Sequence, residues 1–116
     1  MPAKSFIEDE VMAQRARNEK LVETIVRHGG ELEEERPIDF FFYAENRVDA
    51  EALAEDLELI GFDSTHVPDD PIEGKWSVQA VRMATVLEVT DDAFVERIVR
   101  TAAKYLAEFD GWGAPV

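Results

Sequence analysis

The stretch RPIDFFFYA, residues 36–44, decides how the rest of the chain is arranged. Aromatic and β-branched residues are enriched in strands, and this segment is dominated by them. Because successive side chains of a strand point to opposite faces, its large residues lie on both faces. The segment therefore predicts a central strand, or a strand in a sheet whose second face is also covered.

Outward from this strand, helical and strand patterns alternate along the chain. The glycine-rich end, residues 110–116, is predicted as a last edge strand, where Pro115 is tolerated. The other expected elements are a helix at about 6–28, the strand at 36–44, a helix at about 48–60, strands at 62–67 and 76–87, and a helix ending at about 108. This order predicts an α+β fold: a ferredoxin-like split β-α-β core with an antiparallel four-stranded sheet and an additional N-terminal helix. At this length the chain is expected to form one domain, 1–116, with its core at about 36–116.

The first helix has apolar positions at its start and in its C-terminal half. Residues 14–20 are almost wholly polar, which predicts a solvated middle. Gly29 and Gly30 follow as a helix stop. Three positions for this helix stay open: over the open face of the sheet, beside the other helices, or on a second copy of the chain.

The other two helices carry recognisable caps. Asn46 is expected to cap the second helix, and Thr90 is expected to cap the third. The third helix has a wide apolar face, to which the pattern assigns Phe109.

Nothing in the sequence predicts catalysis. There is no cysteine, so disulfides, thiolate metal sites and thiol chemistry are excluded. His28 and His66 have no recognisable triad partners, and the dispersed glycines form no phosphate loop. The acids of the loop at 68–74 lack the spacing of a calcium site. We therefore expect a protein that is not an enzyme and that uses no cofactor or metal.

The net charge of −14 points to the class of partner. Nucleic-acid binding needs a basic surface, and Arg82 is the only cation in the predicted third strand, so direct RNA binding is disfavoured. Residues 37–75 hold eleven acidic and two basic residues. A partner with a basic segment fits this charge, although acidity can also serve solubility alone. The candidate partner-binding residues lie on the second helix and the following loop: Glu51, Glu55, Glu58, Asp69, Asp70 and Glu73. A structural, self-associating domain is the alternative.

The chain shows no signal peptide, because no apolar run follows its charged start. No stretch approaches the roughly 20 apolar residues that a membrane helix needs. The cytoplasm is the expected location, without membrane contact.

The segment Phe109-Asp110-Gly111-Trp112-Gly113 resembles the C-terminal signature of the ribonuclease E inhibitor B family. The resemblance implies a ferredoxin-like fold and a non-catalytic regulator that binds ribonuclease E and modulates RNA decay. Some members continue into a long acidic tail, whereas this sequence ends at Val116, so no tail-dependent function is implied. A Trp between two glycines more often completes a core than contacts a partner, and we expect Trp112 to be buried.

Overall fold

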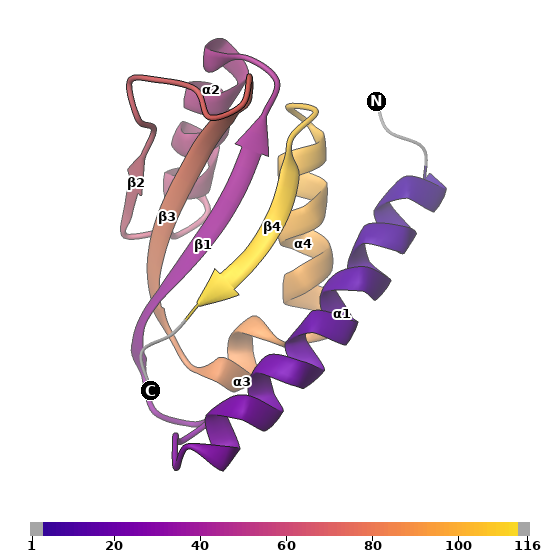
Figure 1. The fold of residues 1–116 in the computed structure, drawn as a ribbon, viewed down its shortest axis with the longest axis vertical. Helices are drawn as coiled ribbons and strands as arrows, with labels where there is room; N and C mark the ends of the chain where they lie inside the picture. Colours follow the sequence, from indigo (N-terminus) through magenta and orange to yellow (C-terminus); the bar gives the residue numbers. More distant parts are fainter. Residues whose placement is uncertain (1–3, 114–116) are drawn as a thin grey trace.

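The computed structural model describes residues 4–113 and shows the expected α+β architecture (Figure 1). Four strands form one antiparallel sheet in the order β2-β3-β1-β4, which is the ferredoxin-like order. The elements are α1 (Lys4–Arg27), β1 (Arg36–Ala44), α2 (Arg47–Leu59), β2 (Ser64–His66), β3 (Trp76–Ala84), α3 (Val86–Val89), α4 (Asp92–Ala103) and β4 (Glu108–Gly113).

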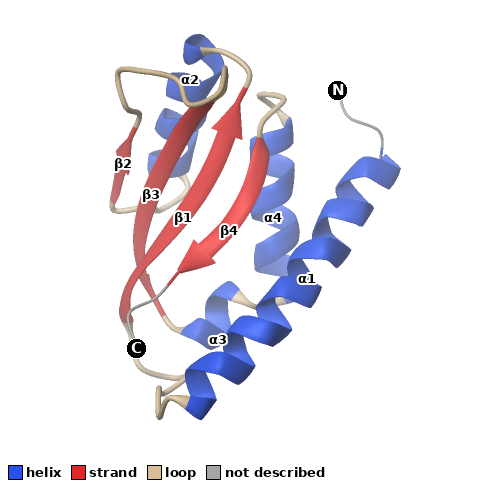
Figure 2. Cartoon of the chain, viewed as in Figure 1, coloured by secondary structure: helices blue, strands red, loops and turns tan. Residues whose placement is uncertain are grey.

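The strand β1 lies at the centre of the sheet, between β3 and β4, as the aromatic segment predicts. Ile38, Phe40 and Phe42 are fully buried on the face that α2 and α4 cover (Figure 2). The ring of Phe40 meets the ring of Phe62 edge to face, with 5.0 Å between centroids. The hydrophobic core therefore lies between the helices and one face of the sheet, and within residues 4–113 no helix lies over the other face.

The helix α1 packs beside α4, past the β4 edge of the sheet (Figure 1). The second of the three positions left open by the sequence is thus the observed one. Ile25 is buried near its end, and Arg15 forms an ion pair with Asp92 at the start of α4.

The prediction of a solvated middle for α1 is confirmed for the exposed residues 15–17, 19 and 20 and is wrong for two residues. Gln14 is fully buried and Asn18 is 3% exposed. The Asn18 side-chain oxygen accepts hydrogen bonds from Gln14 Nε2 at 2.7 Å and from Trp112 Nε1 at 2.6 Å. The Asn18 oxygen is thereby satisfied, while its buried Nδ2 has no hydrogen-bond partner among the described residues. A distant Trp supplies a donor that a local pattern cannot show.

The predicted third helix is too long at both ends. It ends at Ala103, because Leu106 adopts a left-handed backbone with φ 55° and closes the last turn. Glu108 and Phe109 therefore belong to β4, and Phe109 lies in the sheet. The N-cap of α4 is Asp91, whose carboxylate accepts from Phe94 N. The predicted cap, Thr90, lies one residue before it. Of the predicted last strand, residues 110–113 are in β4, and residues 114–116, with Pro115, lie outside the described part.

The predicted third strand is also too long. It ends at Ala84, and Thr85 then caps the short helix α3 by accepting from Glu88 N at 3.1 Å. Val86 and Val89 of this helix are buried. The pattern Thr85-x-x-Glu88 is the sequence signal of a capping box, and it marks the helix start that apolar residues alone conceal.

A β-bulge explains the spacing of the C-terminal signature. The register between β1 and β4 shifts at Phe41 and Phe42, so that Phe42 pairs with Phe109 and Phe40 pairs with Trp112. In a regular strand, residues three apart face opposite sides, but the bulge turns both aromatic residues of β4 inward. Gly111 accommodates the distortion with a φ of 128°.

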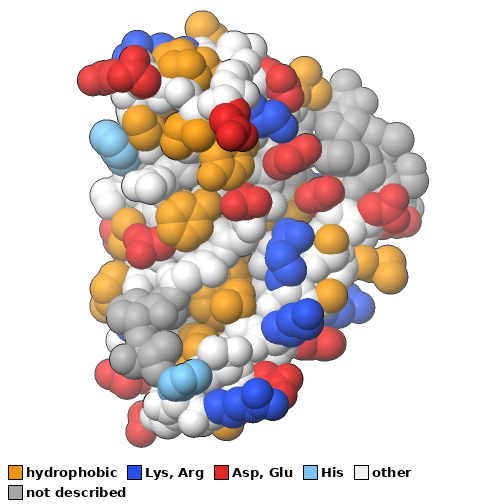
Figure 3. All heavy atoms as spheres, viewed as in Figure 1, with side chains coloured by type: hydrophobic (Ala, Val, Ile, Leu, Met, Phe, Trp, Pro, Cys, Tyr) orange, Lys and Arg blue, Asp and Glu red, His pale blue; other side chains and the backbone are white. Residues whose placement is uncertain are grey.

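Side chains are unevenly distributed over the face shown in Figure 3. Hydrophobic side chains run along the strands, while Lys and Arg side chains follow the path of α1. Among the described residues, no helix has the length and apolar character needed to cross a bilayer.

Candidate protein-binding surface

The outer face of α2 presents its glutamates to solvent. Asn46 begins the helix as predicted, because its side-chain oxygen accepts from Asp49 N at 2.8 Å. The inward positions, including Leu53 and Leu57, are fully buried. The opposite positions are exposed: Glu51, Glu55 and Glu58. The expected solvated stripe is therefore present, with the spacing of a single helix face.

Arg47 joins the helix to the loop between β2 and β3. Its Nε donates to Glu51 Oε1 at 2.8 Å, and its Nη2 lies 3.8 Å from Asp69 Oδ1. The hydrogen bond to Glu51 raises the pKa of Arg47 above its ordinary value, with the charges of Glu51 and Asp69 adding to the effect. The guanidinium also lies over the Trp76 ring, 5.5 Å from its centroid. The structure thus brings Glu51 and Asp69 together around one cation.

The remaining loop acids are exposed but less closely linked to α2. Asp70 is exposed beside Asp69. Glu73 lines a cavity of about 300 Å3 with Tyr43, Ile72 and Lys75. No described contact brings Glu73 to the helix, so it lies at the margin of the candidate surface.

Two acids of this region, Glu58 of the exposed row and Asp63, also hold the fold together. Glu58 Oε2 accepts from Thr65 Oγ1 at 2.5 Å, which ties α2 to β2. Asp63 Oδ2 accepts from the backbone N–H of Met83 at 2.8 Å. The carboxylate of Asp63 thereby provides an acceptor for a backbone N–H near the end of β3 and stabilises that end of the strand.

Tyr105 and Asp56 form a contact between α2 and the turn after α4. The Tyr105 hydroxyl donates to Asp56 Oδ2 at 2.9 Å. This hydrogen bond, with partial burial and the charge of Asp56, raises the pKa of Tyr105 above its ordinary value of 10.0. Lys104 Nζ lies 3.8 Å from the same carboxylate oxygen. Asp56 is therefore partly neutralised by Lys104, as Glu51 is by Arg47.

Sequence reasoning missed the apolar residues on the outer face of α2. Val48 is 76% exposed and Leu59 is 85% exposed. Leu59, Glu55 and Glu58 line an open cavity of about 540 Å3. Positions 48 and 59 lie on one helix face by their spacing, and this spacing is the sequence signal for the pair.

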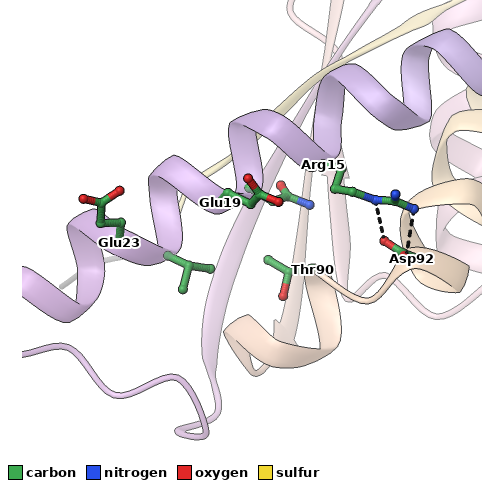
Figure 4. Close-up of a pocket in the computed structure, with 7 residues that line it drawn as sticks. Arg15, Glu19, Glu23, Thr90 and Asp92 are labelled. Carbon is green, nitrogen blue, oxygen red and sulfur yellow. Dashed lines mark hydrogen bonds and ion pairs between the residues drawn. The ribbon is translucent and has the colours of Figure 1, made fainter.

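A third cavity, of about 530 Å3, lies between α1 and the segment that joins α3 to α4 (Figure 4). At one end of this cavity, Arg15 Nη2 lies 2.9 Å from Asp92 Oδ2. The cavity is also lined by Glu19, Glu23 and Thr90. Among the described residues there is no cluster of His, Cys, Asp and Glu able to hold a metal ion. The cavity combines carboxylates with an arginine that is already paired, and it contains no nucleophile with an adjacent base.

The signature residues 109–113 serve mainly the fold. Trp112 is 5% exposed, as predicted, and Phe109 is equally buried. Gly111 is buried as well, and Gly113 is half-buried. Only Asp110, in the bulge, is exposed. The specific C-terminal pattern is therefore explained by packing and by the anchoring of α1.

Fold and surface together define a class: a small α+β binding domain with an exposed acidic helix face. The family model for regulator of ribonuclease activity B, RraB, matches residues 15–114, and the chain belongs to this family. Membership confirms the resemblance seen in the C-terminal signature. It makes the chain a non-catalytic regulator of ribonuclease E that acts by binding protein. A comparison with curated proteins found no match.

Proposed function

We propose that the exposed acids of α2 and of the β2–β3 loop bind a basic segment of ribonuclease E. We call this set the acidic surface, and it consists of Glu51, Glu55, Glu58, Asp69 and Asp70, with Glu73 at its margin. The observation that carries the proposal is the row of three exposed glutamates on one face of α2. Arg47 is paired with Glu51 and Asp69. This single cation offsets only one of the five acidic charges, so the acidic surface keeps a net negative charge.

The proposal takes residues 1–116 as one binding unit that meets its partner in the cytoplasm. The unit contacts RNA only through the ribonuclease, because a net charge of −14 repels phosphate. Opposite charges on two proteins accelerate their encounter and make the association rate sensitive to salt.

The test is the triple variant Glu51→Lys, Glu55→Lys and Glu58→Lys. Its association with purified, nuclease-treated ribonuclease E is measured by surface plasmon resonance at several salt concentrations. We expect the association rate at low salt to fall by about tenfold or more, because steering then turns into repulsion. The ability to modulate RNA cleavage by the enzyme should fall in parallel.

The matched control reverses three exposed glutamates elsewhere: Glu19→Lys, Glu96→Lys and Glu108→Lys. Both triple variants carry the same net charge, so the comparison separates a local surface from overall charge. The control should keep most of the wild-type association rate. Equal rates in the two variants would remove the acidic surface from the proposal.

A further inference from the structure

Two exposed apolar side chains lie near the two ends of α2, on the outer face that also carries the glutamates of the acidic surface. Val48 and Leu59 are the most exposed large hydrophobic residues of the described chain, at 76% and 85%. Leu59 follows Val48 by eleven residues. The two side chains are therefore about 20° apart around the helix axis and about 16 Å apart along it. They therefore begin and end a single stripe, on which Ala52 and Glu55 lie between them.

Acids flank this stripe on both sides. Helical spacing puts Glu51 and Glu58 on one side and Asp49 and Asp56 on the other. Asp56 is partly neutralised by Lys104, so the glutamate side is the more negative of the two. Single exposed hydrophobic residues are normal on protein surfaces. Here, two of them share a stripe with a cavity of about 540 Å3 beside Leu59 and with negative charge along their flanks. This combination fits a partner that is apolar in the centre and basic at its borders.

The shape of the stripe favours a helical partner. Residues on one face of a helix recur every turn of about 5.4 Å, so three turns match the separation of Val48 and Leu59. An extended segment repeats its side chains at about 6.6 Å, which does not match. An extended segment also gains affinity by pairing with free backbone groups, and the interior of α2 offers none, because its N–H and C=O groups are bonded within the helix.

We propose that the partner segment is an amphipathic helix with basic residues beside an apolar face, and that Val48 and Leu59 are its apolar contacts. This inference rests on the proposed function of the acidic surface and specifies its occupant. The glutamates accelerate the encounter, and the two apolar side chains slow dissociation.

The test is the double variant Val48→Ala and Leu59→Ala, which preserves helix propensity. Binding to purified ribonuclease E is measured by surface plasmon resonance. We expect the dissociation rate to rise about 10-fold to 100-fold, because each lost apolar contact weakens binding by up to about tenfold. The association rate and its salt dependence should not change. Leu59→Gln alone, at a fully solvated helix end, should reproduce part of the effect.

The matched control is Met12→Ala and Val26→Ala, which truncates two exposed apolar residues of α1. It should dissociate like the wild type. If the double variant of α2 also dissociates like the wild type while the Lys triple variant still associates slowly, the apolar contact is wrong and the acidic surface stands. If neither variant changes binding, the proposed function itself fails.

A second readout concerns the partner. Peptides that tile the basic regions of ribonuclease E are mixed with the protein, and far-UV circular dichroism is recorded. The peptide that binds should gain helical signal at 222 nm with the wild type and lose this gain with the double variant. A peptide that binds at the acidic surface without gaining helical signal would overturn the helical occupant.

Discussion

Asn18 shows how one polar residue fixes the position of an entire helix. A buried indole N–H needs an acceptor, and Trp112 finds it on α1, 94 residues earlier in the chain. The same oxygen accepts from Gln14, whose own oxygen accepts from Arg17 Nη2 at 2.6 Å. The signature Trp and the N-terminal helix are therefore joined by a chain of hydrogen bonds.

Asn18→Leu is expected to lower the free energy of unfolding by about 1–3 kcal/mol. The substitution keeps the number and branching of the side-chain heavy atoms but leaves the Trp112 N–H buried without an acceptor. Urea unfolding followed by circular dichroism measures the loss. Glu19→Ala, at the exposed neighbouring position, should change stability by less than about 0.5 kcal/mol. A similar small effect at Asn18 would mean that the indole N–H reaches water.

At the scale of elements, β4 depends on its bulge. The bulge lets Phe109 and Trp112 enter the core together, and it requires the backbone of Gly111 at φ 128°. An added Cβ at Gly111 would meet no atom within 4 Å, so only the backbone conformation resists substitution. The strand thus depends on one glycine for its conformation.

Gly111→Ala is expected to destabilise the protein by on the order of 1–3 kcal/mol, because an L-residue is strained in this region of φ. Gly113→Ala is the control in the same strand. Its added methyl group would lie at an ordinary 3.9 Å from the Phe41 ring, without a left-handed backbone. Thermal unfolding of both variants should show a large loss at Gly111 and a small change at Gly113. Equal losses would contradict the role given to the bulge.

At the scale of the whole molecule, negative charge is concentrated in a small volume. The net charge is −14, and the principal extents are 40 × 31 × 27 Å. In 10 mM salt the screening length is about 30 Å, so like charges repel one another across the entire molecule. The same repulsion is relieved when a basic partner binds, which couples the stability of the domain to its proposed partner.

Salt should therefore stabilise the free protein. We expect the thermal midpoint to rise by a few degrees between 10 mM and 1 M NaCl, where the screening length falls to about 3 Å. The control triple variant at Glu19, Glu96 and Glu108 carries less negative charge and should show a smaller rise. A midpoint that falls with added salt would show instead that attractive surface ion pairs dominate.

Local patterns predicted much of the fold. The aromatic segment at 36–44, the Asn46 cap and the exposed glutamates of α2 all depend on the geometry of a few neighbouring residues. The ends of elements were less predictable. Helical spacing continues through Phe109, but its pairing with Phe42 on a neighbouring strand places it in the sheet. Contacts between distant residues decide such boundaries, and no local period contains them.

What the sequence determined by itself is the class of molecule: an α+β domain without a reactive centre, acidic in its middle third, with a recognisable C-terminal signature. Tertiary contacts alone place α1 beside α4, bury Gln14 and Asn18 within its polar middle, and join Glu51 to Asp69 through Arg47. They also leave Val48 and Leu59 uncovered on the outer face of α2. The physical reason is that periodicity and charge are properties of the chain itself, whereas burial depends on which distant segment packs against each face.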